Sequence, residues 1–130
     1  MDYYYTTRLG NITFDQAVNR VTEALAKEGF GVATEMDMKA TFKNKLNVDF
    51  YNYKILGACN PLFAYKALEA EDKIGTMLPC NFILQENVNG IIEISAVNPL
   101  ASMQSVKNEF LKGIASEINE KVKNVIHSLE

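Results

Sequence analysis

Residues 81–97 read NFILQENVNGIIEISAV, and their alternating apolar and polar residues around an Asn-Gly pair predict a β-hairpin. A two-residue Asn-Gly turn would set Glu86 opposite Glu93, and like charges that face each other across paired strands are destabilising. The sequence therefore favours a three-residue loop over 88–90, with its glycine in the left-handed conformation.

This register also sorts the hairpin into two chemically different faces. On one face lie the apolar residues Phe82, Leu84, Ile94 and Ala96. The other face gathers Ile83, Gln85, Glu93 and Ser95. A slip of one residue would mix the two sets, so the pattern predicts antiparallel pairing with one mostly apolar face.

Strand and helix signals alternate before the hairpin. Residues 3–8, 30–35 and 53–58 are predicted strands. Thr13 and Gln16 form a capping box that begins a helix, which ends at Gly29. Asp37 can cap a brief helix. Gly57 allows close backbone approach near the end of the strand 53–58.

Two Asn-Pro pairs mark helix starts, because Asn is a good cap and Pro suits the first helical position. Asn60-Pro61 predicts a short helix that ends in the acidic run 69–72. Asn98-Pro99 predicts a long helix to about residue 129. Its apolar stripe would be Val106, Phe110, Ile114, Ile118, Val122, Val125 and Leu129.

This order predicts an α+β fold with a mostly antiparallel sheet of about five strands, covered on one face by helices. The chain has 130 residues, of which 48% are apolar and 22% charged, as in ordinary globular proteins. We expect a single domain over residues 1–130.

Charge and composition also exclude several classes of function. The net charge is -3, without a cluster of Lys or Arg that would favour binding to nucleic acid or an anionic membrane. The first residues lack the pattern of a signal peptide, and no apolar run approaches the roughly 20 residues that span a bilayer. We expect a cytoplasmic protein whose two cysteines are reduced.

Several segments together resemble a known family. Residues 53–61 read YKILGACNP, followed by AY at 64–65, AL at 67–68, IG at 74–75 and LPCN at 78–81. With EMD at 35–37 and the stretch 41–46, they resemble the domain of unknown function family numbered 302. The resemblance covers nearly the whole chain and implies a fold likened to that of the TATA-binding protein, with strand, helix, antiparallel strands and a C-terminal helix. It implies no activity.

The chemical signature of the chain is the matched pair Cys59-Asn60 and Cys80-Asn81. Cys59 lies just before a predicted helix N-terminus, whose partial positive charge favours the thiolate. Cys80 opens a strand, and strand ends can lie side by side in an antiparallel sheet. Helix capping accounts for Asn60, whereas Asn81 has no such explanation.

Our leading hypothesis is a pocket for a small molecule near Cys59, Asn60, Cys80 and Asn81, partly lined by neighbouring aromatic residues. One alternative is a thiol-based redox enzyme or sensor that uses both cysteines. Another is binding of a soft metal or haem through the thiols. Both thiols could also be unreactive packing residues. The sequence specifies neither a cofactor nor an enzyme class.

Other residues give weaker signals. A closed zinc site needs four ligands, and the sole imidazole, His127, is expected to be solvated near the end of the last helix, so we assign no metal ligands. The carboxylates Glu35, Asp37, Glu86 and Glu93 are acid–base candidates by location only. The tyrosines at 3–5 have aromatic rings on both faces of a possible edge strand, which suggests a homodimer through this strand or the long helix.

Overall fold

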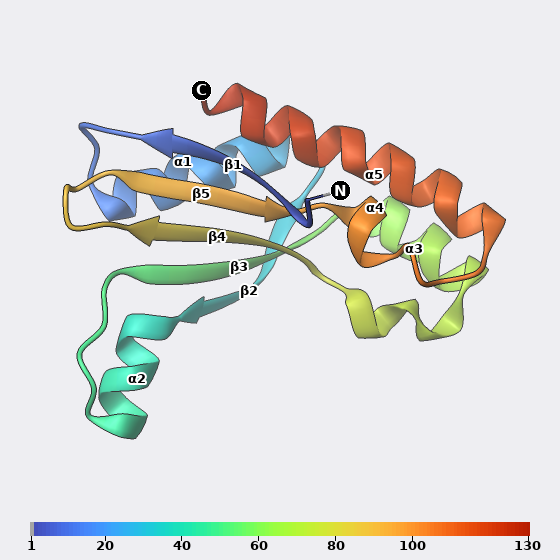
Figure 1. Cartoon of the computed structure of the whole chain (residues 1–130). Helices are drawn as coiled ribbons and strands as arrows, with labels where there is room; N and C mark the ends of the chain where they lie inside the picture. Colours follow the sequence, from blue (N-terminus) through green and yellow to red (C-terminus); the bar gives the residue numbers. More distant parts are fainter. Residues whose placement is uncertain (1) are drawn as a thin grey trace.

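The computed structural model describes residues 2–130. Over these residues the strands form one antiparallel sheet with the order β1-β5-β4-β3-β2 (Figure 1). The strands are β1 (Tyr4–Leu9), β2 (Gly31–Asp37), β3 (Tyr53–Cys59), β4 (Cys80–Glu86) and β5 (Ile92–Val97). The predicted α+β class with a five-stranded antiparallel sheet is confirmed, and β1 is an edge strand.

The helices are α1 (Phe14–Lys27), α2 (Met38–Leu46), α3 (Pro61–Ala70), α4 (Pro99–Ser102) and α5 (Glu109–Ser128), with a 3-10 helix η1 (Asp72–Met77). Figure 1 shows the long helix α5 lying across the sheet on the same side as α1. The short helices α3 and α4 pack against α5, and α2 contacts β2 and β3 at the other edge.

The hairpin between β4 and β5 has the predicted register. Phe82 pairs with Ala96 and Leu84 pairs with Ile94. Gly90 has a φ of 74°, the left-handed conformation expected in the three-residue loop.

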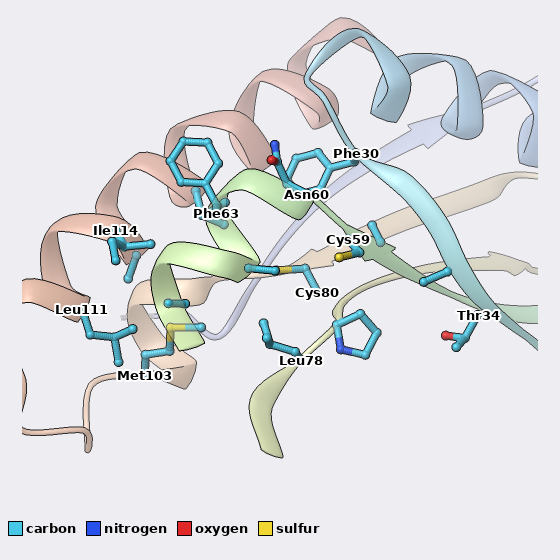
Figure 2. Close-up of a pocket in the computed structure, with 17 residues that line it drawn as sticks. Phe30, Thr34, Cys59, Asn60, Phe63, Leu78, Cys80, Met103, Leu111 and Ile114 are labelled. Carbon is cyan, nitrogen blue, oxygen red and sulfur yellow. The ribbon is translucent and has the colours of Figure 1, made fainter. Parts of the chain in front are cut away.

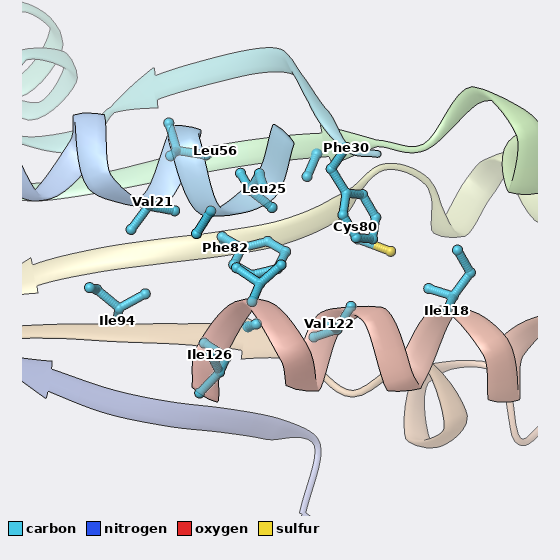
Figure 3. Close-up of a cluster of buried hydrophobic side chains, with 14 of the residues drawn as sticks. Val21, Leu25, Phe30, Leu56, Cys80, Phe82, Ile94, Ile118, Val122 and Ile126 are labelled. Carbon is cyan, nitrogen blue, oxygen red and sulfur yellow. The ribbon is translucent and has the colours of Figure 1, made fainter. Parts of the chain in front are cut away.

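The core lies between the sheet and the two long helices, as Figure 3 shows. Alternation along β4 and β5 turns one side chain in two toward α1 and α5. The fully buried side chains there include Val21, Leu25, Leu56, Phe82, Leu84, Ile94, Val122 and Val125. Cys80 lies at the end of this core nearest α3.

The prediction of one long helix from Pro99 to about residue 129 was wrong. The chain leaves helical geometry after Ser102 and α5 begins only at Glu109. The side chain of Asn108 accepts a hydrogen bond from the backbone N–H of Leu111 (3.1 Å) and donates one to the Ala70 carbonyl (2.8 Å). A second cap, stabilised by a contact with the end of α3, therefore restarts the helix.

The break changes only the start of the predicted apolar stripe, since Ile114, Ile118, Val122, Val125 and Leu129 are buried as expected. Val106 lies in the linker, and Phe110 is 70% exposed. Leu111 is buried in its place. In α3, Phe63 and Ala67 are buried, while Leu62, Tyr65 and Leu68 are exposed.

Candidate functional site

The two cysteines lie at the same end of the sheet. β3 ends at Cys59, and α3 begins two residues later at Pro61. Cys80 is the first residue of β4 and pairs with Ala58, the neighbour of Cys59. Both cysteines are free thiols. The antiparallel pairing thus brings together two segments that are about 20 residues apart in the chain.

Asn60 lies at the N-cap position of α3, but its side chain makes a different hydrogen bond from the one expected of a cap. It accepts no hydrogen bond from the first turn of α3. Instead its Nδ2 donates to the backbone carbonyl of Glu28, at 3.2 Å, where α1 ends. The side chain is buried, so this contact joins the end of α1 to the start of α3.

Gly57 lets three segments approach one another beside the cysteines. A Cβ on Gly57 would lie 2.6 Å from Cγ of Pro79, and it would also clash with Oγ1 of Thr34. The missing side chain therefore allows β2 and the segment before β4 to close over β3, as the sequence predicted for this glycine.

A cavity of about 270 Å³ lies between this end of the sheet, α3 and α5 (Figure 2). The sheet side is formed by Phe30, Ala58, Cys59 and Cys80. The helices contribute Phe63 and Ala67 from α3, Leu111, Ile114, Ala115 and Ile118 from α5, and Met103 comes from the preceding linker. Apart from the two thiols, Thr34 and Asn60 are the polar side chains that line it.

The exposed and half-exposed lining residues mark the mouth of the cavity. They are Ala33, Thr34, Cys59, Ala64, Leu78 and Pro79. Among residues 2–130, no charged side chain lines the cavity or this rim. The mouth is therefore neutral and the interior is apolar.

The two thiols differ in their surroundings. Cys59 is half-exposed at the mouth, and Cys80 is buried. Burial, and to a smaller extent the negative charge that Cys59 can carry, raises the pKa of Cys80 to about 11. Cys80 is therefore a neutral thiol at pH 7, which is a poor nucleophile.

Asn81 does not join the other three predicted site residues. Its neighbour Cys80 faces the core, so alternation along β4 turns Asn81 to the opposite face of the sheet, where it is exposed. There it lines a separate hollow of about 430 Å³ with Tyr3, Tyr4 and Tyr53. The structure thus brings together Cys59, Asn60 and Cys80, and places Asn81 elsewhere.

Comparison with protein families agrees with this fold. The model of the family described as "Domain of unknown function DUF302" matches residues 5–129. The chain belongs to this family. The resemblance that the Cys-Asn segments suggested is thereby confirmed, and the DUF302 match covers both cysteines and the cavity residues.

A solved structure has the same architecture. The crystal structure of an uncharacterized conserved DUF302 protein from Bacillus stearothermophilus superposes with a TM-score of 0.91. The two sequences are 25% identical, and the match covers 100% of each chain. A search of curated proteins found no match.

The carboxylates that were acid–base candidates have structural partners in this DUF302 chain. Glu35 binds Lys54 at 2.8 Å, and Glu93 binds Arg8 at 3.0 Å. Asp37 caps α2, and Glu86 accepts a hydrogen bond from Asn52. None of the four lines the cavity between the sheet and α3.

Within the described residues, no three His, Cys, Asp or Glu side chains gather closely enough to hold a metal ion. A soft metal in the cavity would have the thiols of Cys59 and Cys80 and the thioether of Met103 as its sulfur ligands. Of the helices in residues 2–130, none has the length and apolar character needed to cross a membrane.

Met103 and the α5 residues that line the cavity were not predicted from the sequence. In the expected continuous helix, Met103 would lie in the second turn, and Leu111 would lie outside the predicted apolar stripe. Asn108, followed by the acidic Glu109, is the local signal of a second helix start that could have revealed the linker.

Proposed function

We propose that this DUF302 protein binds a small, neutral and largely apolar molecule in the cavity between β3, β4, α3 and α5. The observation that carries the proposal is the cavity itself, about 270 Å³ in volume and open through a neutral rim. Ligand sites in proteins are concave and mostly apolar, with a few polar groups that orient the ligand, and most have volumes of about 300–1,000 Å³, so this cavity suits only a small ligand.

The polar groups of the site suit such a ligand. Thr34 at the mouth can donate or accept a hydrogen bond, and Cys59 and Cys80 are weak donors with polarizable sulfurs. A charged ligand would lose hydration in the apolar interior without an opposite charge to offset the loss. The site therefore favours neutral molecules of about the size of a substituted benzene.

The raised pKa of Cys80 bears on the two-thiol redox alternative. The attacking cysteine in thiol–disulfide exchange must be a thiolate, and burial keeps Cys80 protonated at neutral pH, so Cys80 would not be the attacking thiol. Cys59, at the mouth, remains the accessible thiol. Treatment of the folded protein with iodoacetamide at pH 7.5, followed by peptide mass spectrometry, should modify Cys59 far faster than Cys80. Equal, rapid modification of both thiols would favour the redox alternative.

Titration with toluene and indole, followed by 1H–13C NMR of the alanine methyl groups, tests the cavity directly. We expect saturable shifts at Ala64, Ala67 and Ala115, which line the cavity, with little change at Ala24 on the buried side of α1. Acetate, which is charged, should produce no saturable shift.

A matched pair of variants on α5 provides the control. Ala115→Leu adds a side chain to the cavity wall, and Ser116→Leu adds the same side chain at an exposed neighbour. Ala115→Leu should abolish the shifts, and Ser116→Leu should leave them unchanged. Absence of saturable shifts in the unmodified protein with either apolar probe, or binding that survives Ala115→Leu, would refute the proposed site.

A further inference from the structure

The face of the sheet opposite α1 and α5, here called the open face, carries rows of paired side chains. The registers of the strand pairs place Thr6, Ser95, Ile83, Ile55 and Met36 in one row across all five strands. A second row contains Arg8, Glu93, Gln85 and Tyr53. The helices that bury side chains against the sheet, α1 and α5, lie on the other side (Figure 1).

These two rows are almost free of charge, although the chain has 29 charged residues by the sum of 13 basic and 16 acidic ones. The charged members, Arg8 and Glu93, form an ion pair at 3.0 Å. A protein with a net charge of -3 is repelled by its own copies at long range, and a neutral face is where two copies meet with the least cost.

Several polar side chains of the two rows already have hydrogen-bond partners. Ser95 donates to Thr6 Oγ1 (3.1 Å), which donates to the carbonyl of Ile94 (3.2 Å). Gln85 donates to the hydroxyl of Tyr51 at 3.4 Å. Burial of Ser95, Thr6 and Gln85 would therefore leave few of their donors or acceptors without a partner, which lowers the cost of covering this part of the face.

The open face has both a hollow and an exposed apolar side chain. The hollow of about 430 Å³ lies over Ile83 and Ser95, with Tyr3, Tyr4 and Tyr53 around it. Met36, in the same row as Ile83 and Ser95, is 50% exposed although it is apolar. Suppose that two copies meet open face to open face, related by a twofold axis that lies between the sheets and runs parallel to the strands. The Met36 side of one copy then lies over the β1–β5 side of the other.

The dimensions of the sheet allow a contact between copies of about the minimum size for a specific interface. Five strands spaced about 4.8 Å apart, with six residues rising about 3.3 Å each, give a footprint of about 500 Å² per copy. Two copies would cover about 1,000 Å², which is near the lower bound for a specific interface. Two identically twisted sheets can also pack face to face with their strands nearly aligned.

We propose that the open face is the contact surface of a homodimer, in which two copies pack sheet to sheet around Ile83, Ser95 and Met36. This interface is independent of the cavity near Cys59, which opens at the end of the sheet. It also differs from pairing of the edge strands β1, because the side chains and not the backbone groups of β1 make the contact.

Sedimentation equilibrium of the purified chain at 1–100 µM tests the proposal. We expect a mass of twice 14.6 kDa. Met36→Lys and Ile83→Lys each place an unpaired charge on the open face. Both should shift the chain to monomer, with a dimer dissociation constant at least tenfold larger than that of the unmodified chain. Circular dichroism and the thermal midpoint should show an intact fold.

The matched control is Leu62→Lys, which changes another exposed apolar residue, on α3 and away from the open face. This variant should remain dimeric. The proposal is overturned if the unmodified chain is monomeric at 100 µM. It is equally overturned if the chain is dimeric but both open-face lysine variants keep the dimer, since the contact would then be elsewhere, such as the β1 edge.

Discussion

Asn60 and Asn98 precede a proline in the same way, yet their side chains have different partners. Asn98 caps α4 by accepting hydrogen bonds from the backbone N–H groups of Leu100 and Ala101, and its Nδ2 donates to the Asp2 carbonyl at 3.0 Å. Asn60 donates to the Glu28 carbonyl but accepts no hydrogen bond from its own helix. The dipeptide determines where each helix begins, and the tertiary environment determines what the amide does.

Substitution of Asn60 by Asp separates these two roles. Asp is as good an N-cap as Asn but has no N–H to donate, so Asn60→Asp should lower the free energy of unfolding by about 1–3 kcal/mol. Urea unfolding followed by circular dichroism measures this loss. Equal stabilities of Asn60→Asp and the unmodified protein would contradict the assigned bond between Asn60 and Glu28.

Gly57 and Gly31 lie on the paired strands β3 and β2 but differ in the space around them. A Cβ at Gly57 would meet Pro79 and Thr34, whereas a Cβ at Gly31 would meet nothing within 4 Å. Gly57→Ala should therefore destabilise the fold by about 1–3 kcal/mol, and Gly31→Ala should change stability by about 0.5 kcal/mol or less. Thermal unfolding of the two variants compares them directly, and equal midpoints would show that the close approach is not required.

The raised pKa of Cys80 makes stability depend on alkaline pH. The folded thiol ionises near pH 11, whereas an unperturbed cysteine ionises near 9.0, so the unfolded state loses its proton first as the pH rises. The contribution of the neutral Cys80 thiol to the free energy of unfolding is thus complete below about pH 9 and is lost between about pH 9 and pH 11. Two pKa units correspond to about 2–3 kcal/mol.

Urea unfolding at pH 8.5 and pH 10.5 checks this linkage. The loss of stability between these values should be smaller in Cys80→Ala than in the unmodified protein, because tyrosines and lysines titrate in both. Cys59→Ala, at the half-exposed position, is the matched control. Parallel losses in all three proteins would mean that ionisation of Cys80 is not linked to folding.

At the scale of the elements, local patterns predicted most of the structure. The capping box at Thr13 and Gln16 forms as expected, with hydrogen bonds of 3.0 and 3.1 Å. Asp37 caps α2, and the β4–β5 hairpin has the register expected from its charges. The last helix was predicted wrongly only at its start, because Val106 and Phe110 fit a periodicity of four residues that continued through the linker, whereas the stripe from Ile114 to Leu129 is buried as expected.

Two adjacent residues near the start of α5, Phe110 and Leu111, test which of them packs in the core. Leu111→Ala should cost about 2–5 kcal/mol, since this side chain is 1% exposed and packs in the core. Phe110→Ala removes a larger side chain that is 70% exposed, so it should cost about 0.5 kcal/mol or less. Chemical denaturation of both variants measures the two losses of unfolding free energy. A larger loss for Phe110→Ala than for Leu111→Ala would support a continuous helix from Pro99.

At the scale of the whole molecule, one hydrophobic cluster joins α1, α5 and the sheet. Helix α2 contributes no buried residue to it and rests against β2 and β3. A single core shared by distant segments predicts one cooperative unfolding transition, while α2 should open locally at lower free energy.

Hydrogen exchange measures both properties. Amides of β4 and α5 should exchange with the free energy of global unfolding, and those of α2 should exchange faster. Urea transitions detected by circular dichroism and by tyrosine fluorescence should coincide. Separate transitions would contradict cooperative unfolding of the whole core. Protection of α2 equal to that of α5 would contradict local opening of α2.

The sequence by itself determined the features that depend on near neighbours: the hairpin register, the helix starts other than that of α5, the strand alternation and the family. Caps and turns act within a few residues, and alternation along a strand is fixed by backbone geometry. The tertiary structure decided that Asn60 bonds to Glu28, that Asn81 faces away from the thiols, and that Met103 and α5 complete the cavity. These features depend on side chains from segments distant in the chain, whose packing no local pattern encodes.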